Sequence, residues 1–323
     1  MRAVVVEQHG GPDVLGVVDL DIPEPGPGQI RVDVAASGVN FIDLYERTGA
    51  YPKQLPFLAG SEGAGTVSDV GPGVADVSVG DRVAWAMVPG GGYAEVVVVP
   101  ADRVVAVPDD VSLDTAAAMM LQGLTAHYLC ESTFPIKRGQ TALVHAAAGG
   151  MGLLLTQMIS GKGAGVIGTT SSEEKAALAR QAGAAEVVDY TTADVVAEIR
   201  RMTGGRGVDV VYDGVGESTF DASLDCLAVR GTMVLFGAAS GPVPPVDPQV
   251  LNRKGSLFLT RPTLAHHIAT REELLWRAGE VFGQVADGRL SVRIGGRYAL
   301  DQAGRAHEDL AERRTTGKLL IVP

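Results

Sequence analysis

Short apolar runs, separated by turns rich in glycine and proline, fill the first third of the chain. Apolar runs of the kind that form strands lie at residues 4–6, 29–35, 65–70, 82–86 and 93–99. The turns include Pro-Glu-Pro-Gly-Pro-Gly at 23–28 and Pro-Gly-Gly-Gly at 89–92. This punctuation predicts short strands that are joined closely. We therefore expect a compact, partly open β-barrel in this part of the chain.

The pattern changes near residue 112, where Ser112 is a suitable N-cap for a helix rich in alanine and methionine that runs to residue 121. From about residue 124, apolar strands alternate with helices. The expected strands are 141–147, 165–170, 186–190, 208–214, 231–237 and 256–260, and the expected helices are 152–162, 172–182, 193–202 and 218–227. This alternation predicts a parallel sheet covered on both faces, and six strands suit a doubly wound dinucleotide-binding fold.

The C-terminal part is expected to return to the first domain. It has a helix at 271–286, a strand at 296–299, a helix from residue 301 and a final strand at 318–322. A chain of 323 residues is too long for one ordinary core. We therefore predict two domains, one made of residues 1–123 and 267–323 and the other of residues 124–266.

Charge and composition narrow the classes of partner. The net charge is −11 and the isoelectric point is near 5.0, which disfavours nonspecific binding to nucleic acid or anionic membranes. Cys130 and Cys226 lie far apart without a CxxC spacing, which excludes a disulfide framework and a four-cysteine zinc site. No apolar run reaches the roughly 18 residues of a membrane span, and no signal peptide is recognised. We expect a cytoplasmic protein that binds neither nucleic acid nor membrane.

A glycine-rich turn marks the candidate cofactor site. Ala-Ala-Gly-Gly-Met-Gly at 147–152 follows an apolar strand and opens a helix. Small residues at such a turn let the backbone approach a pyrophosphate, and the helix N-terminus offers N–H groups and the positive end of its dipole. Ala147 replaces the first glycine of the usual fingerprint. The predicted dinucleotide contacts are Gly149, Gly150, Met151 and Gly152.

The end of the next strand indicates which dinucleotide binds. Sites that prefer NAD place Asp or Glu there, about 20 residues beyond the glycine loop, to bind the ribose 2′-hydroxyl. Here residues 168–175 read Gly-Thr-Thr-Ser-Ser-Glu-Glu-Lys. Ser171, Ser172 and Lys175 suit a 2′-phosphate, whereas Glu173 and Glu174 are expected to face solvent. We therefore predict NADPH as the cofactor.

Four further motifs are distinctive. They are Gly-Val-Asn-Phe-Ile-Asp-Leu-Tyr at 38–45, Gly-Ser-Glu-Gly-Ala-Gly at 60–65, Val-Tyr-Asp-Gly-Val-Gly at 211–216 and Gly-Ser-Leu-Phe-Leu-Thr-Arg-Pro at 255–262. With the glycine loop, they resemble the zinc-independent quinone oxidoreductases (ζ-crystallin-like) of the medium-chain dehydrogenase/reductase superfamily. The resemblance covers essentially the whole chain. It implies a GroES-like catalytic barrel and a Rossmann domain that binds NADPH.

The resemblance also predicts that zinc is absent. Zinc-dependent relatives carry a cysteine where this chain has Asn40, a histidine at Ser61 and a second cysteine near Leu121. Asparagine, serine and leucine do not form a three-ligand zinc site. Between Trp85 and Tyr93, a short glycine-rich link replaces the four-cysteine lobe of those relatives. Without a Lewis acid, alcohol oxidation lacks a means of activating the alcohol, so we expect reduction of an electrophilic acceptor.

Individual residue roles follow from the same resemblance. Asn40, Asp43 and Tyr45 are expected to line the cleft near the nicotinamide, with Tyr51 on the substrate side. The other implied cofactor contacts are Tyr128 at the pyrophosphate, Tyr190 at the 2′-phosphate, Gly214 at the ribose, Phe236, Gly237, Ala238, Ala239, Ser240, Thr260, Arg261 and Pro262 at the nicotinamide, and Arg313 from the C-terminal segment. For Tyr128 and Tyr190, packing with a satisfied hydroxyl is the alternative interpretation.

The expected reaction is hydride transfer to a small conjugated acceptor, a quinone. Asn40 and Tyr45 are the candidates to hydrogen-bond the developing oxygen anion, and Tyr51 completes the catalytic set. A reduced quinone oxygen is weakly basic, so we expect water to supply the proton without an obligatory general acid. The sequence leaves hydride transfer and one-electron transfer both open.

Two alternatives remain at this point. The same scaffold reduces α,β-unsaturated carbonyls and enoyl thioesters, but only Arg47 and Lys53 flank residues 40–51, which favours a small acceptor over an acyl-CoA. A non-catalytic protein that binds NADPH or RNA is disfavoured by the acidic charge. The family is commonly dimeric, so we predict a homodimer through the last strand of the dinucleotide sheet, residues 256–260.

Overall fold

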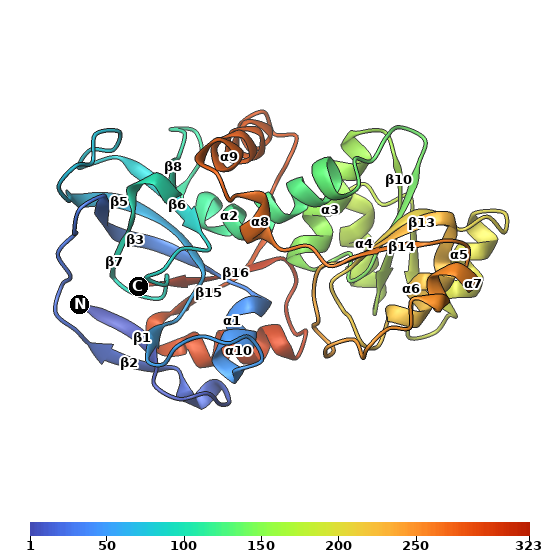
Figure 1. Cartoon of the computed structure of the whole chain (residues 1–323), viewed down its shortest axis with the longest axis horizontal. Coiled ribbons are helices and arrows are strands. Elements are labelled where there is room, and N and C mark those ends of the chain that lie inside the picture. Colours follow the sequence, from blue (N-terminus) through green and yellow to red (C-terminus); the bar gives the residue numbers. More distant parts are fainter. The chain divides into compact units, whose positions relative to one another are not determined.

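The computed structural model describes all 323 residues, which form two compact units. The first unit comprises Met1–Leu124 and His267–Pro323, and the second comprises Thr125–His266. Each unit is built on its own β-structure (Figure 1). No helix in the structure combines the length and the hydropathy needed to cross a membrane.

A seven-stranded sheet forms the centre of the first unit, in the order β15-β16-β3-β5-β6-β8, with β7 paired to β3. Its strands are β3 (Gln29–Val39), β5 (Glu62–Val70), β6 (Arg82–Ala86), β7 (Val96–Pro100), β8 (Val104–Ala106), β15 (Ile294–Ala299) and β16 (Lys318–Val322). A smaller sheet contains β2 (Gly16–Asp19), β1 (Arg2–Val6) and β4 (Phe57–Leu58). The long strand β3 pairs antiparallel with β5, β7 and β16, which brings distant parts of the chain together.

Helices follow the strands of the first unit. They are α1 (Phe41–Thr48), α2 (Leu113–Tyr128), α9 (Arg271–Ala286) and α10 (Ala303–Ala311), with short 3-10 helices at Pro12–Val14, Ala101–Arg103 and Leu300–Gln302. Ser112 caps α2 as predicted, because its Oγ accepts a hydrogen bond of 3.1 Å from the Thr115 N–H. Helix α2 continues beyond the predicted end at residue 121, through Leu124 and into the second unit.

The second unit contains a six-stranded parallel sheet, in the order β11-β10-β9-β12-β13-β14. Its strands are β9 (Thr141–Val144), β10 (Gly165–Thr170), β11 (Glu186–Asp189), β12 (Val208–Asp213), β13 (Leu227–Leu235) and β14 (Phe258–Thr260). Its helices are α3 (Gly150–Gly161), α4 (Glu173–Gln181), α5 (Val195–Met202), α6 (Phe220–Cys226), α7 (Gln249–Arg253) and α8 (Leu264–His267), after a π-helical turn at Leu129–Thr133. The strand order reverses between β9 and β12, which confirms the predicted doubly wound fold.

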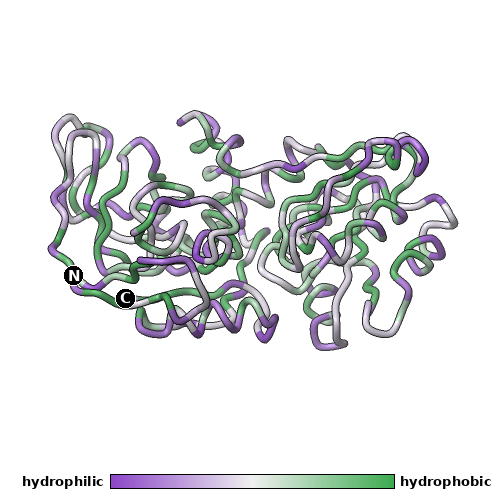
Figure 2. The backbone as a smooth tube through the Cα atoms, turned by 60° about the horizontal axis from the view of Figure 1, so that its bottom comes forward, coloured by the Kyte–Doolittle hydropathy of each residue, from purple (hydrophilic) through white to green (hydrophobic).

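Hydropathy follows the layers of the second unit. Green, apolar stretches run through its central strands, and the purple, hydrophilic stretches concentrate in helices and connecting turns (Figure 2). Leu143, Val211 and Met233 from three neighbouring strands are fully buried in one apolar cluster. Burial on both faces explains why these strands read as nearly continuous apolar runs rather than alternating ones.

One helix near the motif at 38–45 was not predicted. Helix α1 begins directly after β3, and the Asp43 carboxylate in its first turn accepts a hydrogen bond of 2.8 Å from the Asn40 N–H. An acidic side chain that satisfies an unpaired N–H at a helix start stabilises that start. The helix has only eight residues, too short for its periodicity to stand out in the sequence.

Candidate functional site

The carboxyl ends of the parallel strands meet at one edge of the second unit. The glycine loop follows β9, residues 171–175 follow β10, Tyr190 follows β11 and Gly214 follows β12. Residues 236–240 follow β13, and Arg261 and Pro262 follow β14. In doubly wound sheets, ligands bind at this edge where the strand order reverses, here between β9 and β12. The fold therefore gathers these predicted contacts along one edge.

The glycine loop is shaped by close backbone packing. A Cβ atom on Gly152 would lie 2.3 Å from the Ala146 carbonyl oxygen and 2.6 Å from the Ala147 Cα, so only glycine fits. The loop is tied to β10, because the Ala147 N–H donates to the Thr169 carbonyl at 3.0 Å. The first N–H groups of α3 have no partner within the helix, as at any helix start. Together these groups suit an anion such as a pyrophosphate, and their contact with the cofactor stays a prediction.

Hydroxyl and ammonium groups gather at the end of β10. The Lys175 Nζ lies 3.4 Å from the Ser171 Oγ, and Ser172 caps α4 by accepting a hydrogen bond of 3.3 Å from the Lys175 N–H. Tyr190 joins them, because its N–H donates to the Thr170 carbonyl at 3.1 Å. These groups suit a 2′-phosphate.

The neighbouring carboxylates point elsewhere. Glu173 pairs with Arg180 at 2.5 Å, and its side chain is 80% exposed. Glu174 is also exposed. Because neither carboxylate is buried among the hydroxyls, a phosphate there would not face a fixed negative charge.

A buried network beneath the glycine loop was missed from the sequence. The His145 ring lies 3.0 Å from the Thr169 Oγ1 and 2.9 Å from the Ser223 Oγ. Ser223 donates in turn to Asp213 Oδ2 at 2.8 Å, and Asp213 Oδ1 accepts from the Val215 N–H at 2.8 Å. Burial lowers the pKa of His145, against the attraction of Asp213. A neutral histidine thus links the ends of β9, β10 and β12.

The turn after β12 lies against the turn after β13. A Cβ on Gly214 would lie 2.8 Å from the Phe236 ring, and the Ala239 N–H donates to the Gly214 carbonyl at 3.2 Å. Ser240 Oγ donates to the Val215 carbonyl at 2.9 Å. These turns are therefore packed and fixed. Tyr128 is buried at the end of α2.

In the first unit, Asn40 sits in a buried cluster of charged and polar groups. Its Oδ1 accepts from the Lys318 Nζ at 2.6 Å and from the Gln122 Nε2 at 3.3 Å. Its Nδ2 donates to Glu62 Oε1 at 2.7 Å and, weakly, to the Gly38 carbonyl at 3.4 Å. Lys318 also forms an ion pair with Glu62, and both side chains are fully buried. A donor role for Asn40 toward an acceptor oxygen requires the weak bond to Gly38 to open.

Asp43 lies beside this cluster, with a different set of partners. Its Oδ1 accepts from the Ser61 Oγ at 2.5 Å, and its Oδ2 accepts from the Asn40 N–H at 2.8 Å and from the Tyr93 hydroxyl at 3.1 Å. Tyr93 also lies 3.1 Å from the His307 Nε2. Burial raises the pKa of Asp43 to about 7, although the bonds from Ser61 and Asn40 act in the other direction.

Tyr45, predicted near the nicotinamide, and Tyr51, predicted on the substrate side, are adjacent. The Tyr45 and Tyr51 rings lie 5.0 Å apart between centroids, and the Tyr51 N–H donates to the Tyr45 carbonyl at 3.0 Å. The Phe41 ring lies 6.2 Å from the Tyr45 ring, tilted by 34°. Tyr51 is 37% exposed. The pair thus forms a partly exposed aromatic surface on and after α1.

Arg313 follows α10 in a left-handed backbone conformation with φ of 58°, and its predicted contact with the cofactor stays a prediction.

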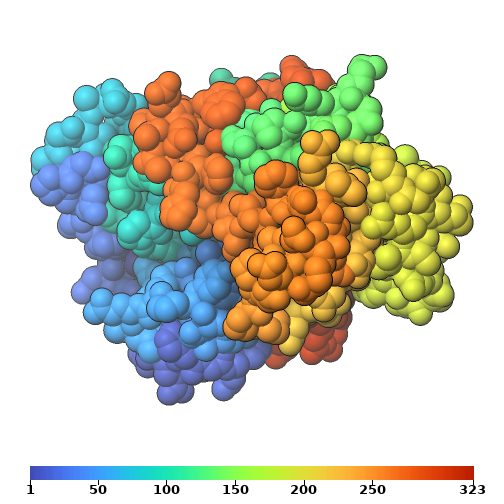
Figure 3. Space-filling view, turned by 45° about the vertical axis from the view of Figure 1, so that its right-hand side comes forward, coloured from blue at the N-terminus to red at the C-terminus, as the bar shows by residue number.

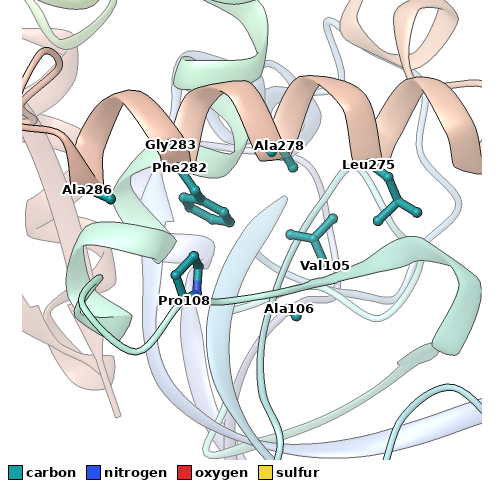
Figure 4. Close-up of a pocket in the computed structure, with 9 residues that line it drawn as sticks. Val105, Ala106, Pro108, Leu275, Ala278, Phe282, Gly283 and Ala286 are labelled. Atoms are coloured by element: carbon teal, nitrogen blue, oxygen red, sulfur yellow. The ribbon is translucent and has the colours of Figure 1, made fainter.

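A groove of about 300 Å³ lies between α9 and β8, lined by apolar residues such as Val105, Pro108 and Phe282 (Figure 4). No titratable side chain lines this groove, so it offers no chemistry for the reaction.

Sequence reasoning predicted Asn40 and Asp43 as site residues but named few of the residues that bond them. Glu62 lies in the motif at 60–65, directly after Ser61, and this position was the only signal for it in the sequence. Lys318 lies 256 residues from Glu62 along the chain, and His307 lies 214 residues from Tyr93. No local pattern links residues at such separations.

Comparison with known proteins agrees with this organisation. Residues 26–109 match the alcohol dehydrogenase GroES-like domain, and residues 150–274 match the family model described as zinc-binding dehydrogenase. The chain is 48% identical over 316 residues to a quinone oxidoreductase of Pseudomonas aeruginosa, covering 98% of this chain and 97% of that protein. It is 41% identical over 331 residues to a 2-haloacrylate reductase of a Burkholderia species, covering 100% and 99%.

A solved structure shows the same similarity. The quinone oxidoreductase of Escherichia coli, solved in complex with NADPH, is 44% identical, matches with a TM-score of 0.98 and covers 100% of both chains. These matches confirm a GroES-like domain combined with a Rossmann-type sheet. At such identity over its full length, the chain belongs to the quinone oxidoreductase family of the medium-chain dehydrogenase/reductase superfamily.

Proposed function

We propose that this protein reduces a quinone with hydride from NADPH and needs no metal ion for the reaction. The observation that carries the proposal is 48% identity to a quinone oxidoreductase over 98% of the chain. The E. coli relative was solved with NADPH, and this chain has residues suited to the same cofactor. When bound, NADPH supplies a hydride from its nicotinamide.

The second unit fits a phosphorylated dinucleotide. At Gly152, a Cβ would collide with the loop backbone, so the loop holds a narrow turn over the start of α3. We assign the pyrophosphate to the N–H groups of this helix start. Ser171, Ser172 and Lys175 are assigned to the 2′-phosphate, with Tyr190 beside them.

The first unit does not fit zinc. Asn40 Oδ1, at a position where zinc-dependent relatives carry a ligand, is held by the Lys318 ammonium at 2.6 Å. The hydroxyl of Ser61 donates a hydrogen bond to Asp43, and the side chain of Leu121 has no atom that can bind a metal. An ammonium at this point repels a second cation. The chain's own side chains, rather than a Lewis acid, therefore hold and polarise the acceptor in this proposal.

Tyr45 and Tyr51 are assigned to the acceptor. Their rings lie 5.0 Å apart at an angle of 50° and are partly exposed. An aromatic surface of this kind suits a flat, apolar quinone ring, and a phenolic hydroxyl donates to a developing oxygen anion. Asn40 is assigned beside them, with its amide orientation fixed by Lys318 and Glu62.

A second candidate has its own support. The 2-haloacrylate reductase relative is 41% identical over the full length, and its name describes an acceptor with a conjugated double bond. Reduction of α,β-unsaturated carbonyls or enoyl thioesters by the same residues is therefore the alternative. It differs from quinone reduction in the shape of the acceptor, not in the source of the hydride.

A turnover screen separates these functions. NADPH oxidation is followed with 1,4-benzoquinone, 2-cyclohexenone, 2-chloroacrylate and crotonyl-CoA, and we expect the highest kcat/KM with the quinone. A higher value with an enone, the haloacrylate or the thioester would establish the alternative. Gel-shift titration with RNA at physiological salt covers the non-catalytic class, and RNA binding without turnover would refute the enzyme assignment.

We also propose a homodimer formed through β14. This strand is the edge of the sheet and pairs only with β13. Phe258 on β14 is 60% exposed and Val229 on β13 is 74% exposed, and the orange segment that includes β14 lies on the surface (Figure 3). An apolar edge strand is a natural pairing surface. Sedimentation equilibrium at micromolar concentration tests this, and a monomer would refute it.

A further inference from the structure

Hydrogen bonds lead from Arg47 through His307 and Tyr93 to Asp43, and the donor of each can be assigned. Arg47 Nη1 lies 3.3 Å from His307 Nδ1, and because arginine only donates, this ring nitrogen accepts. Burial, and then Arg47, lower the pKa of His307 to about 3, so the ring is neutral near pH 7. A neutral ring with Nδ1 as the acceptor carries its hydrogen on Nε2, which lies 3.1 Å from the Tyr93 hydroxyl.

This orientation determines which oxygen of Asp43 holds a proton. Because Tyr93 accepts from His307, its own hydrogen points to Asp43 Oδ2 at 3.1 Å. The Asn40 N–H donates to the same oxygen at 2.8 Å. With two donors on Oδ2, a proton on the carboxyl group belongs on Oδ1. That atom lies 2.5 Å from the Ser61 Oγ.

The hydroxyl of Ser61 therefore has two states. When Asp43 is charged, the hydroxyl donates to Oδ1. When Asp43 carries a proton, Oδ1 donates to Ser61, and the hydroxyl hydrogen is released to another acceptor. Ser61 Oγ and the Asn40 N–H bond the two oxygens of the same Asp43 carboxylate, which places the released hydrogen close to Asn40, a residue assigned to the acceptor.

Both charge states of Asp43 are accessible near neutral pH. Asp43 is 3% exposed, and burial raises its pKa to about 7. The charged groups around it act in both directions: Glu46 raises the pKa and Lys318 lowers it. Burial also holds the pKa of Tyr93 well above its usual value, so Tyr93 stays a neutral donor.

We propose that Ser61 delivers the proton that completes reduction of the acceptor, and that Asp43 supplies this proton to Ser61. The proposal rests on the quinone reduction proposed above and replaces the expectation that water alone is the proton source. Tyr93 and His307 are positioning residues, because they keep the proton of Asp43 on Oδ1.

The step balances without a further reactant. After hydride transfer, the acceptor oxygen carries a negative charge. The O–H bond of Ser61 breaks and an O–H bond forms on the acceptor, while the proton on Asp43 Oδ1 moves to the Ser61 Oγ. Asp43 is left as a carboxylate, which takes one proton from water after the product leaves. Each turnover thus consumes one hydride and one proton.

The test compares pH profiles of variants with 1,4-benzoquinone as the acceptor. For the native protein, kcat is expected to be constant at acidic pH and to fall as the pH rises through about 7, because Asp43 then loses its proton. Asp43→Asn keeps an oxygen for Tyr93 and an N–H for Ser61 but has no acidic proton. We expect it to lower kcat about 10²-fold at pH 6 and to remove the fall near neutral pH.

Variants of Ser61 and a matched control complete the test. Ser61→Ala is expected to reproduce the Asp43→Asn result, and Ser61→Thr, which keeps the hydroxyl, to restore the native profile. Ser37→Ala removes another buried hydroxyl of this unit, bonded to the Glu62 carbonyl at 2.5 Å, and is expected to change neither kcat nor its profile. NADPH binding by fluorescence and the melting temperature verify that each variant is folded.

A second readout does not depend on turnover. NMR of protein labelled with ¹³C at aspartate carboxyls should show one resonance that titrates near pH 7 and is absent in Asp43→Asn. An unchanged kcat profile in Asp43→Asn or Ser61→Ala, or an Asp43 resonance that titrates near 4, would overturn the proposal. If the native protein fails to oxidise NADPH with every quinone tested, the proposed function itself fails, rather than the proton route.

Discussion

The candidate sites of the two units consist of different kinds of group. In the second unit, the site consists of backbone groups, glycines and short hydroxyl side chains at one sheet edge, with residues such as Gly152 and Ser171 close together in sequence. In the first unit, it consists of buried charged side chains, and Glu62 and Lys318 are 256 residues apart. The first kind of site suits the binding of an anion by dipoles. The second fixes side-chain orientations and proton positions, at the cost of burying charge.

The largest expected effect falls on the buried ion pair of the first unit. Lys318→Met leaves the Glu62 carboxylate buried without its cation, and breaking a buried pair in this way costs about 3–5 kcal/mol of unfolding free energy. Urea denaturation of the variant measures this loss. The double variant that adds Glu62→Gln removes both charges and should recover part of it.

The matched control lies in the second unit. Lys162 pairs with Glu131 at 2.6 Å, but both side chains are about one-third exposed. Lys162→Met should therefore change the unfolding free energy by only about 0–1 kcal/mol. Equal losses of unfolding free energy for Lys318→Met and Lys162→Met would contradict the expected difference between the buried ion pair of the first unit and the exposed one of the second.

The next effect concerns the glycine loop. Gly152→Ala places a methyl group 2.3 Å from the Ala146 carbonyl oxygen, so the loop must shift and the dissociation constant for NADPH should rise by at least about 10-fold, equivalent to 1.4 kcal/mol. Gly161→Ala on the same helix is the control, since nothing lies within 4 Å of its added methyl group. Fluorescence titration with NADPH measures both, and equal affinities would show that the loop does not bind the cofactor.

An effect selective for one of the two dinucleotides is expected at the end of β10. Lys175→Ala removes one phosphate partner, and a hydrogen bond to a charged group is worth about 1.5–3 kcal/mol, so KM for NADPH should rise about 10-fold to 100-fold. KM for NADH should change little. Arg180→Ala removes a charge from the same helix that is already paired with Glu173, and should leave both values unchanged. A parallel rise for NADH would contradict the assignment.

The difference between the two units also explains which parts of the structure could be predicted from the sequence. The doubly wound sheet and the glycine loop follow from local patterns, because each strand is apolar along its whole length and each turn contains its own signal residues. Strands β6, β10 and β16 and helix α9 were predicted at their observed bounds. The short helix α1 was missed, since its capping by Asp43 leaves little trace in hydropathy.

The side-chain networks were beyond local reasoning. Asn40 was predicted as a site residue, but the direction of its amide is set by Lys318, which only the pairing of β3 with β16 brings near. Likewise, the proton position on Asp43 depends on His307, which belongs to α10 near the other end of the chain. The bonds of His145 to Thr169 and Ser223 likewise join residues 24 and 78 positions apart.

One measurement tests the central claim directly, namely that these two units reduce a quinone with NADPH and without a metal. The protein is dialysed against a chelator, its zinc content is determined, and NADPH oxidation with 1,4-benzoquinone is followed on the same sample. We predict full turnover at a zinc content far below one ion per chain. Activity that disappears on dialysis and returns on addition of zinc would contradict the account.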